Sequence, residues 1–213
     1  MNIDTTVSAQ MKLQAIQRNT AIIEVVGTSP LIVHRWSEKA KQMMLDAQQG
    51  RKAPKQVKDP QADYESSMYR FSDGGHGFPT LGFKAASVTA AGRVFGKSVK
   101  MTELRVALSF LADGIAAGSG GEQLTRITGE PTMREDMVRV GMGNADLRYR
   151  AQYVDWSARL LIQYLPNMLD LETVASIIDI GGVQGVGEWR PEKDGIYGTY
   201  QVSSIDQIQK ENT

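Results

Sequence analysis

Residues 153–165 constrain the fold of this chain more than any other segment, because apolar and polar side chains alternate there without interruption. The apolar series is Val154, Trp156, Ala158, Leu160, Ile162 and Tyr164, and the polar residues between them include Asp155, Ser157, Arg159 and Gln163. Such alternation is typical of a strand that is buried on one face and solvated on the other. The segment therefore predicts a sheet with one face packed on a core and one face open.

The remaining elements follow from periodicity, caps and turn residues. We expect strands at 21–26 and 31–33, a helix from Ser37 to Gly50, an extended segment with a turn over 64–78, a helix over 80–94 opened by Pro79, strands at 103–111 and 123–128, a helix capped by Asp170 and ended by Gly181 and Gly182, and a last strand from 196 to 202.

This order is the split βαβ pattern of ferredoxin-like and RRM-like domains, which predicts an α+β fold with an antiparallel sheet and two packed helices. One domain is expected over 1–213, with a helical insertion at 35–63 and a thumb-like hairpin excursion at 129–150. The sheet would leave its second face open, and RRM domains bind single strands on that face.

Composition excludes several classes of function. The chain has 213 residues and no cysteine, which excludes disulfides, thiolate catalysis and cysteine-ligated metal centres. A polar N-terminus and the lack of a long apolar run predict a soluble protein of the bacterial cytoplasm without a membrane partner. The adjacent Glu135 and Asp136 would point apart on a strand, so no metal site and no cofactor are expected.

Charge is balanced overall but not locally. The chain carries 24 basic and 24 acidic residues, yet residues 34–58 hold seven Lys or Arg against two acids, a net +5 that leaves −5 for the rest. A local basic patch can bind a polyanion with strong salt dependence. A solvated helix and linker would have the same composition.

Residues 181–198 form a glycine-rich loop between the last helix and the last strand. A helix-to-strand connection needs one glycine for its cap, whereas this loop has six, with Trp189, Arg190 and Lys193 among them. Glycine lets the backbone approach a ligand closely, and bare N–H groups beside a guanidinium suit a phosphate. The alternative is an ordinary surface loop.

The segment Gly77-Phe78-Pro79-Thr80-Leu81-Gly82-Phe83-Lys84-Ala85-Ala86 and the glycine-rich loop resemble the RAMP superfamily, in particular the Cas7 group of CRISPR backbone subunits. These are RRM-like proteins that coat guide RNA as a filament. The resemblance implies that Lys84 lies near a phosphate, that Gly185 and Gly187 offer backbone contacts, and that 129–150 reaches the strand or a neighbouring subunit. Segments 30–35 and 187–193 are also similar to small bacteriophage proteins without an assigned activity.

The candidate nucleic-acid-binding residues combine cations, glycines and one aromatic. They are His34, Arg35, Lys84, Arg93, Arg134, Arg139, Arg148, Arg150, Gly185, Gly187, Trp189, Arg190 and Lys193. Arginine forks suit phosphate, and Trp189 or Tyr197 would stack on bases. Each candidate has a structural alternative: internal ion pairs for the hairpin arginines, a core or rim position for Trp189, and an ordinary surface histidine for His34.

Three functions remain open at this point. The first is a non-catalytic, sequence-tolerant binder of single-stranded RNA or DNA that forms a homo-oligomer along the strand. The second is a phage-encoded interaction protein that docks on a host or viral complex. The third is an RNA endonuclease with His34 as general base, although the sequence shows no nucleophile-base arrangement and no catalytic residue is assigned.

Overall fold

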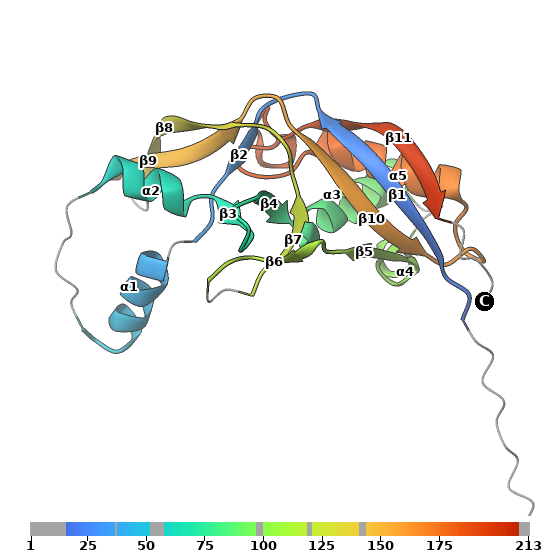
Figure 1. Cartoon of the computed structure of the whole chain (residues 1–213), viewed down its shortest axis with the longest axis horizontal. Helices are drawn as coiled ribbons and strands as arrows, with labels where there is room; N and C mark the ends of the chain where they lie inside the picture. Colours follow the sequence, from blue (N-terminus) through green and yellow to red (C-terminus); the bar gives the residue numbers. More distant parts are fainter. Residues whose placement is uncertain are drawn as a thin grey trace, which may run out of the picture.

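The computed structural model describes residues 16–36, 38–51, 58–96, 100–118, 121–140 and 144–208. Its main sheet contains β1 (Asn19–Gly27), β5 (Leu108–Leu111), β10 (Ser157–Tyr164) and β11 (Tyr200–Ile208), all antiparallel and in the order β11-β1-β10-β5. Helices α3 (Thr80–Val94) and α5 (Leu171–Gln184) lie together behind this sheet in Figure 1. The strand order and the two helices are those of a ferredoxin-like domain, so the predicted α+β architecture is confirmed.

The core lies between the main sheet and the two helices. Ile23 of β1 and Ile162 of β10 are fully buried, as are Phe83 of α3 and Ile177 of α5. The alternate residues of β1 and β10 point to the other face, which is not covered by any helix of the described chain. The prediction of one packed face and one open face is thereby confirmed for the part of 153–165 that forms β10.

The excursion is a β-hairpin, as predicted. β8 (Pro131–Val140) pairs with β9 (Asn144–Tyr153), and β9 also pairs with the short β2 (Leu31–Val33) in the order β2-β9-β8. Helix α2 (Pro60–Ser66) packs on β9. The hairpin therefore belongs to a second sheet that extends from the body (Figure 1).

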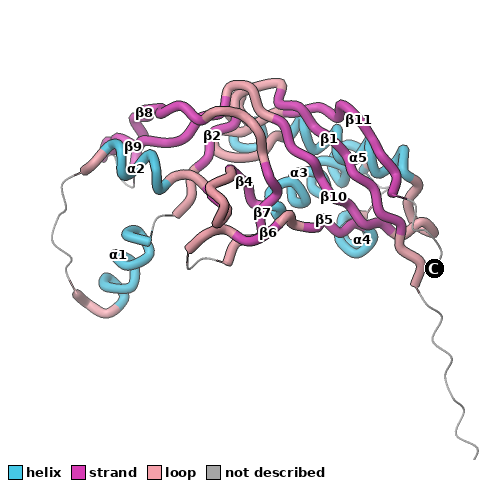
Figure 2. The backbone as a smooth tube through the Cα atoms, viewed as in Figure 1, coloured by secondary structure: helices cyan, strands magenta, loops and turns pink. Residues whose placement is uncertain are grey.

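A third sheet and several short helices complete the described part of the fold. The third sheet has the order β3-β4-β7-β6, from Tyr69–Arg70, His76–Pro79, Gln123–Arg126 and Gly114–Ile115. Helices α1 (Glu38–Gln48) and α4 (Met101–Ala107) and the 3-10 turn η2 (Pro191–Lys193) lie in the connections. Figure 2 shows the main sheet at one end of the long axis and α1 set apart at the other. No described helix is both long and apolar enough to cross a bilayer.

Two helices take up residues that were predicted as extended, 64–66 and 103–107, and the first of them begins inside the predicted insertion. Residues 60–66 form α2 because Asp59 caps it, accepting hydrogen bonds from the amides of Gln61 and Ala62 at 3.0 and 3.1 Å, with Pro60 at the first position. Residues 101–107 form α4, and the predicted strand 103–111 is reduced to β5. The Asp59-Pro60 pair was a sequence signal for the first of these helices.

Three predicted boundaries were also wrong. The alternating run breaks at Val154–Trp156, where the chain passes from β9 to β10, and the Trp156 indole donates to the Ser29 carbonyl at 2.9 Å. Helix α5 continues through Gly181 and Gly182 to a cap at Gly185. The last strand begins only at Tyr200. Each of these element ends is determined by contacts with neighbouring elements, which the periodicity of the sequence does not reveal.

Candidate nucleic-acid interface

The two segments behind the family resemblance line one pocket, although they are far apart in the sequence. The pocket has a volume of about 400 Å³. The start of α3 supplies one wall, the glycine-rich loop supplies another, and a histidine that follows β2 completes the lining. The lining includes Phe78, Pro79, Gly82, Ala86, Gly185, Gly187, Glu188, Arg190, Glu192 and His34. The tertiary structure therefore brings four of the candidate residues, Gly185, Gly187, Arg190 and His34, into one pocket.

The glycines of the loop are required by packing within the chain, a role that the sequence reasoning did not consider. A Cβ on Gly187 (φ +79°) would lie 2.5 Å from the Ile32 carbonyl oxygen, so only glycine fits against β2 there. The amides of Val186, Glu188 and Gly198 donate to carbonyls of Gly198, Ile32 and Pro30 at 2.8–2.9 Å. Many of the N–H groups expected to be bare are thus already bonded.

Trp189 stands at the rim of the loop with its side chain accessible. Trp189 as a whole is 39% exposed, and its backbone has φ +55°, which is uncommon for a residue other than glycine. The Arg134 guanidinium lies 5.9 Å from the Trp189 ring centroid and 4.8 Å from that of Tyr197, within cation–π range of both. Loop and hairpin together present an aromatic surface that a base could stack on.

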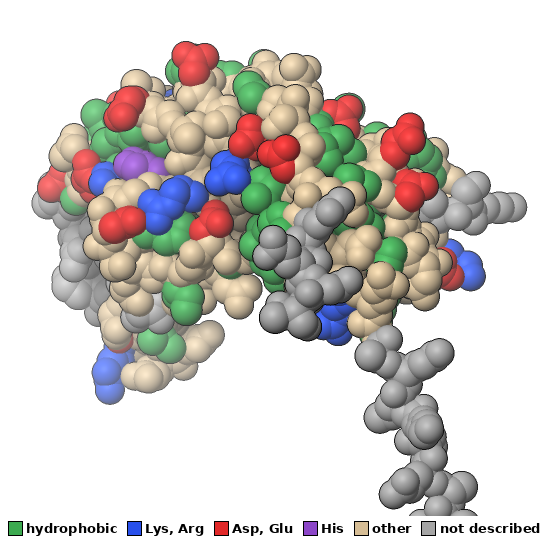
Figure 3. Space-filling model, turned by 45° about the vertical axis from the view of Figure 1, so that its right-hand side comes forward, with side chains coloured by type: hydrophobic (Ala, Val, Ile, Leu, Met, Phe, Trp, Pro, Cys, Tyr) green, Lys and Arg blue, Asp and Glu red, His purple; other side chains and the backbone are tan. Residues whose placement is uncertain are grey.

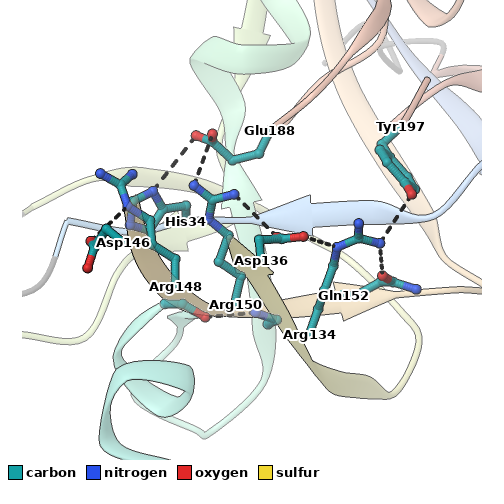
Figure 4. A network of polar contacts seen from close by, with 11 residues as sticks. His34, Arg134, Asp136, Asp146, Arg148, Arg150, Gln152, Glu188 and Tyr197 are labelled. Atoms are coloured by element: carbon teal, nitrogen blue, oxygen red, sulfur yellow. Dashed lines mark hydrogen bonds and ion pairs between the residues drawn. The ribbon is translucent and has the colours of Figure 1, made fainter. Parts of the chain in front are cut away.

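A network of charged side chains joins the hairpin to the loop (Figure 4). Asp136 accepts from Arg134 at 2.7 Å and from Arg150 at 3.4 Å, and Arg150 also lies 3.8 Å from Glu188. Arg134 further donates to the Tyr197 hydroxyl at 3.2 Å. Only 2% of the Arg150 side chain is exposed, and its burial lowers the pKa of the guanidinium. The network fixes the hairpin base against the loop.

This burial corrects the expectation for the hairpin arginines. Arg150 has no accessible surface to offer a bound strand, and Arg134 retains only about a quarter of its side chain exposed. Arg148 pairs with Asp146 at 3.8 Å. The side chain of Arg139, exposed near the hairpin tip, has no ion pair or hydrogen bond within the described residues. The alternative of internal ion pairs is therefore correct for Arg134 and Arg150.

The cations outside the hairpin are also largely engaged. Arg35 donates to the Ala117 carbonyl at 3.1 Å and pairs with Glu122, and Arg190 pairs with Glu192 at 2.8 Å. Lys84, expected near a phosphate at the start of its helix, donates instead to the Arg105 carbonyl of α4 at 3.1 Å. The C-terminal carbonyls of a helix attract cations, which accounts for that position.

Two predicted cations stay accessible beside the pocket. The Arg93 side chain is 60% exposed and reaches the pocket residues Gln184 and Glu192 at 3.1 and 3.6 Å. The Lys193 side chain is exposed and makes no hydrogen bond or ion pair with the described residues. Together with Trp189 they form the accessible set, which we call the pocket rim: Arg93, Trp189 and Lys193.

His34 lies inside the pocket, with Nδ1 4.0 Å from Glu188. Burial, and then the positive charge of Arg150, lower the pKa of His34 below its ordinary value, so the imidazole is neutral near pH 7. The acids Glu188 and Glu192 were missed by the sequence reasoning, which weighed cations. Their positions on either side of Arg190 were the only signal available.

Comparisons with known proteins establish the fold alone. No family model matches the chain, and no curated protein does. A chain from the cryo-EM structure of the Type III-B Cmr-beta bound to cognate target RNA matches with a TM-score of 0.52 and 9% identity, over 90% of this chain and 61% of that one. This chain therefore spans about three fifths of that neighbour's length. Cmr6 from Pyrococcus furiosus matches with a TM-score of 0.41 and 9% identity, over 89% of this chain and 100% of that one. The chain therefore shares its α+β fold with that Cmr-beta chain, which agrees with the fold class expected from the sequence.

Proposed function

We propose that this protein binds single-stranded nucleic acid, without a chemical step, across the pocket between the start of α3 and the glycine-rich loop. Copies bound to one strand would form a homo-oligomer along it. The observation that carries the proposal is the junction itself: a pocket of about 400 Å³, walled by glycine-rich backbone and flanked by the pocket rim.

The chemistry of the pocket rim suits an extended strand. Trp189 offers a ring for stacking, an interaction worth roughly 1–3 kcal/mol per base in single-strand binders. Arg93 contacts the lining residue Gln184, and Lys193 follows the lining residue Glu192 in the sequence; both cations are accessible. The fold also favours nucleic-acid binding, because the Cmr-beta chain that it resembles comes from a structure solved with target RNA.

The charge balance of the pocket sets the expected salt dependence. Each phosphate neutralised by a cation contributes a slope of about −0.7 in log affinity against log salt for single strands. The two rim cations then give about −1.4. If Arg134, Arg148, Arg150 and Arg190 also met phosphates, the slope would approach about −4. A shallow slope therefore distinguishes binding through the pocket rim from binding through all the cations that the sequence suggested.

The test is fluorescence anisotropy with short labelled RNA and DNA oligonucleotides of the same sequence, titrated at several salt concentrations. Replacing Arg93 and Lys193 together by Ala should weaken binding about tenfold and flatten the slope, since each lost phosphate contact removes about 0.7 of it. Trp189→Leu should weaken binding with the slope unchanged, because stacking releases no counterions. The RNA and DNA series also show which nucleic acid is preferred.

Arg159→Ala is the matched control. Its side chain is 66% exposed on the open face of the main sheet, away from the pocket. Unchanged affinity places the strand at the pocket, whereas a loss equal to that of the rim variant would place it on the open face as in an RRM. Cleavage of the labelled oligonucleotide would overturn the non-catalytic assignment, and His34→Ala would then be the first variant to assay.

The pairing of so many cations favours a second candidate, an interaction protein that docks on another protein complex. Arg35, Arg134, Arg150 and Arg190 already have carboxylate partners within the chain. Under this alternative, folded protein freed of nuclease-sensitive material binds neither oligonucleotide at low salt. The same anisotropy experiment separates the two candidates.

A further inference from the structure

The pocket between the start of α3 and the glycine-rich loop has the size and the walls of a site for one planar ring. Its volume of about 400 Å³ lies within the roughly 300–1,000 Å³ of typical small-molecule sites. Its apolar lining is aromatic or small: Tyr69, Phe78, Pro79, Gly82, Ala85, Ala86 and Val186. The rings of Tyr69 and Phe78 meet edge to face, with their centroids 6.5 Å apart. Walls of this kind accept a base that is splayed out of a single strand.

The charges of the lining favour a base inside the pocket and the phosphates outside it. The lining has one cation, Arg190, against the acids Glu188 and Glu192, a net −1 because His34 is neutral near pH 7. Arg190 is already paired with Glu192 at 2.8 Å and donates to the Gly187 carbonyl at 2.9 Å. A phosphate inside would meet this excess of negative charge, whereas a base edge that brings N–H groups would be attracted.

Glu188 is the lining acid whose oxygens are still available. Figure 4 shows its carboxylate facing His34 and Arg150, at 4.0 and 3.8 Å, and both distances exceed the reach of a hydrogen bond. The carboxylate makes no hydrogen bond with the described residues, although its two oxygens can accept several. Its backbone is fixed, since the Glu188 amide donates to the Ile32 carbonyl at 2.9 Å. Two neighbouring acceptors are therefore held in place for a ligand.

His34 adds one hydrogen-bond donor beside these acceptors. Burial, and then the charge of Arg150, lower the pKa of His34 below its ordinary value, so the neutral imidazole carries a single N–H. One donor next to two acceptors is the complement of the Watson–Crick edge of guanine, which presents the O6 acceptor beside the N1–H and N2–H donors. No other of the four bases has two neighbouring donor nitrogens on that edge. The polar groups of the pocket therefore match guanine best.

We infer that the pocket reads one guanine base of the bound strand, with Glu188 accepting from N1–H and N2–H and His34 donating to O6. The inference rests on the proposed function and adds a specificity to it at one nucleotide, while the pocket rim holds the flanking nucleotides without regard to sequence. The face of the molecule in Figure 3 mixes acidic, basic and hydrophobic side chains, without a continuous basic track among the described residues in view. Phosphate contacts there would be few, and a base that is read adds affinity of another kind.

The first experiment is fluorescence anisotropy with labelled oligouridine RNAs that carry a single guanine, adenine, cytosine or inosine at the centre. The RNA with guanine should bind about tenfold more tightly than those with adenine or cytosine and than oligouridine itself. Inosine keeps O6 and N1–H but lacks the N2 amino group, so its affinity should lie between those of guanine and adenine. Equal affinities for all of these RNAs would overturn the inference and leave nucleic-acid binding in place.

The second experiment changes the acceptors that read the base. Glu188→Gln replaces one acceptor by a donor, which suits adenine, so the preference should move from guanine to adenine. A gain for adenine cannot result from a damaged fold. Glu192→Gln is the matched control: it removes the same charge from the same pocket, but from a carboxylate already bonded to Arg190, and should change all the affinities by one factor. A guanine preference that survives in Glu188→Gln, or is lost in both variants alike, would contradict the inference.

The third experiment uses free ligands, so that the pocket is tested apart from the strand. Titration calorimetry with guanosine monophosphate, adenosine monophosphate and argininamide should show binding of the guanine nucleotide at least about tenfold tighter than that of the other two. Argininamide also presents neighbouring N–H donors, and it stands for the arginine of a protein partner. Guanosine monophosphate that binds no better than either would overturn the inference, whether or not the RNAs bind. Binding of the guanine nucleotide without binding of any RNA would instead refute the proposed function alone.

Discussion

Asp136 is the carboxylate on which the buried arginines of the hairpin depend, and its replacement by Asn has a calculable effect on stability. Its side chain is 4% exposed, and it lies between Arg134 at 2.7 Å and Arg150 at 3.4 Å. Asn keeps the shape and one acceptor oxygen but removes the negative charge. The buried Arg150 would then retain only Glu188, at 3.8 Å, as a carboxylate partner.

Removing one partner of a buried ion pair costs about 3–5 kcal/mol, because the remaining charge is left uncompensated. Arg134 is 26% exposed and can turn to water, and the Asn oxygen still accepts one hydrogen bond, so the lower end of the range applies. We expect a loss of about 3 kcal/mol in the free energy of unfolding. In a chain of this length that corresponds to a melting temperature lower by about 6–12 °C.

Urea unfolding followed by circular dichroism measures this loss, with Asp146→Asn as the matched control on the same hairpin. Asp146 is 36% exposed and pairs with two partly exposed cations, Arg148 at 3.8 Å and Lys58, so its replacement should cost only about 1 kcal/mol. Adding Arg150→Met to Asp136→Asn should recover part of the loss, since the unpaired buried charge is removed. Equal stability of the two Asn variants would refute the reasoning that the hairpin is held by this network.

Two further predictions concern packing and pH. Gly182→Ala should lower the free energy of unfolding by about 3 kcal/mol, because the new Cβ would lie 1.9 Å from the Tyr200 carbonyl oxygen. Gly50→Ala is the control, since Gly50 has φ +70° but open space around its Cα, and it should cost about 1 kcal/mol. Equal losses of the two variants in urea unfolding would contradict the packing argument. Burial lowers the pKa of His34 and His76, with Arg150 and Arg70 adding to the effect, so the unfolded chain takes up protons first as the pH falls below about 6.5. Stability should therefore be constant above pH 7 and fall toward pH 5.5. His34→Gln should reduce that fall in melting temperature, and an unchanged profile would show that His34 is not the titrating group.

Local sequence signals were sufficient for much of the architecture. The helix over 80–94 agrees with α3, Asp170 caps α5 by accepting from the Thr173 amide at 2.7 Å, and the excursion is a hairpin. These features depend on residues near one another in the chain, where periodicity and capping operate directly. The ferredoxin-like order then followed from the sequence of strands and helices, with few topologies available.

The site was predicted less well, because the fate of a charged side chain depends on what the fold places beside it. Nothing in the sequence marks Arg150 as buried against Asp136 and Glu188, or Lys84 as bonded to the carbonyl of Arg105. Glycines of the 181–198 loop were expected to serve a ligand, yet Gly187 is required by its contact with the Ile32 carbonyl. Each of these partners is distant in sequence.

The sequence by itself determined the fold class, the hairpin and the two segments that line the pocket, because hydrophobic alternation, helix caps and glycines act over a few residues. Only the tertiary structure decided which cations remain accessible, since a guanidinium binds whichever carboxylate the fold brings within reach. It left Arg93, Trp189 and Lys193 at the pocket rim and paired most of the others inside the chain.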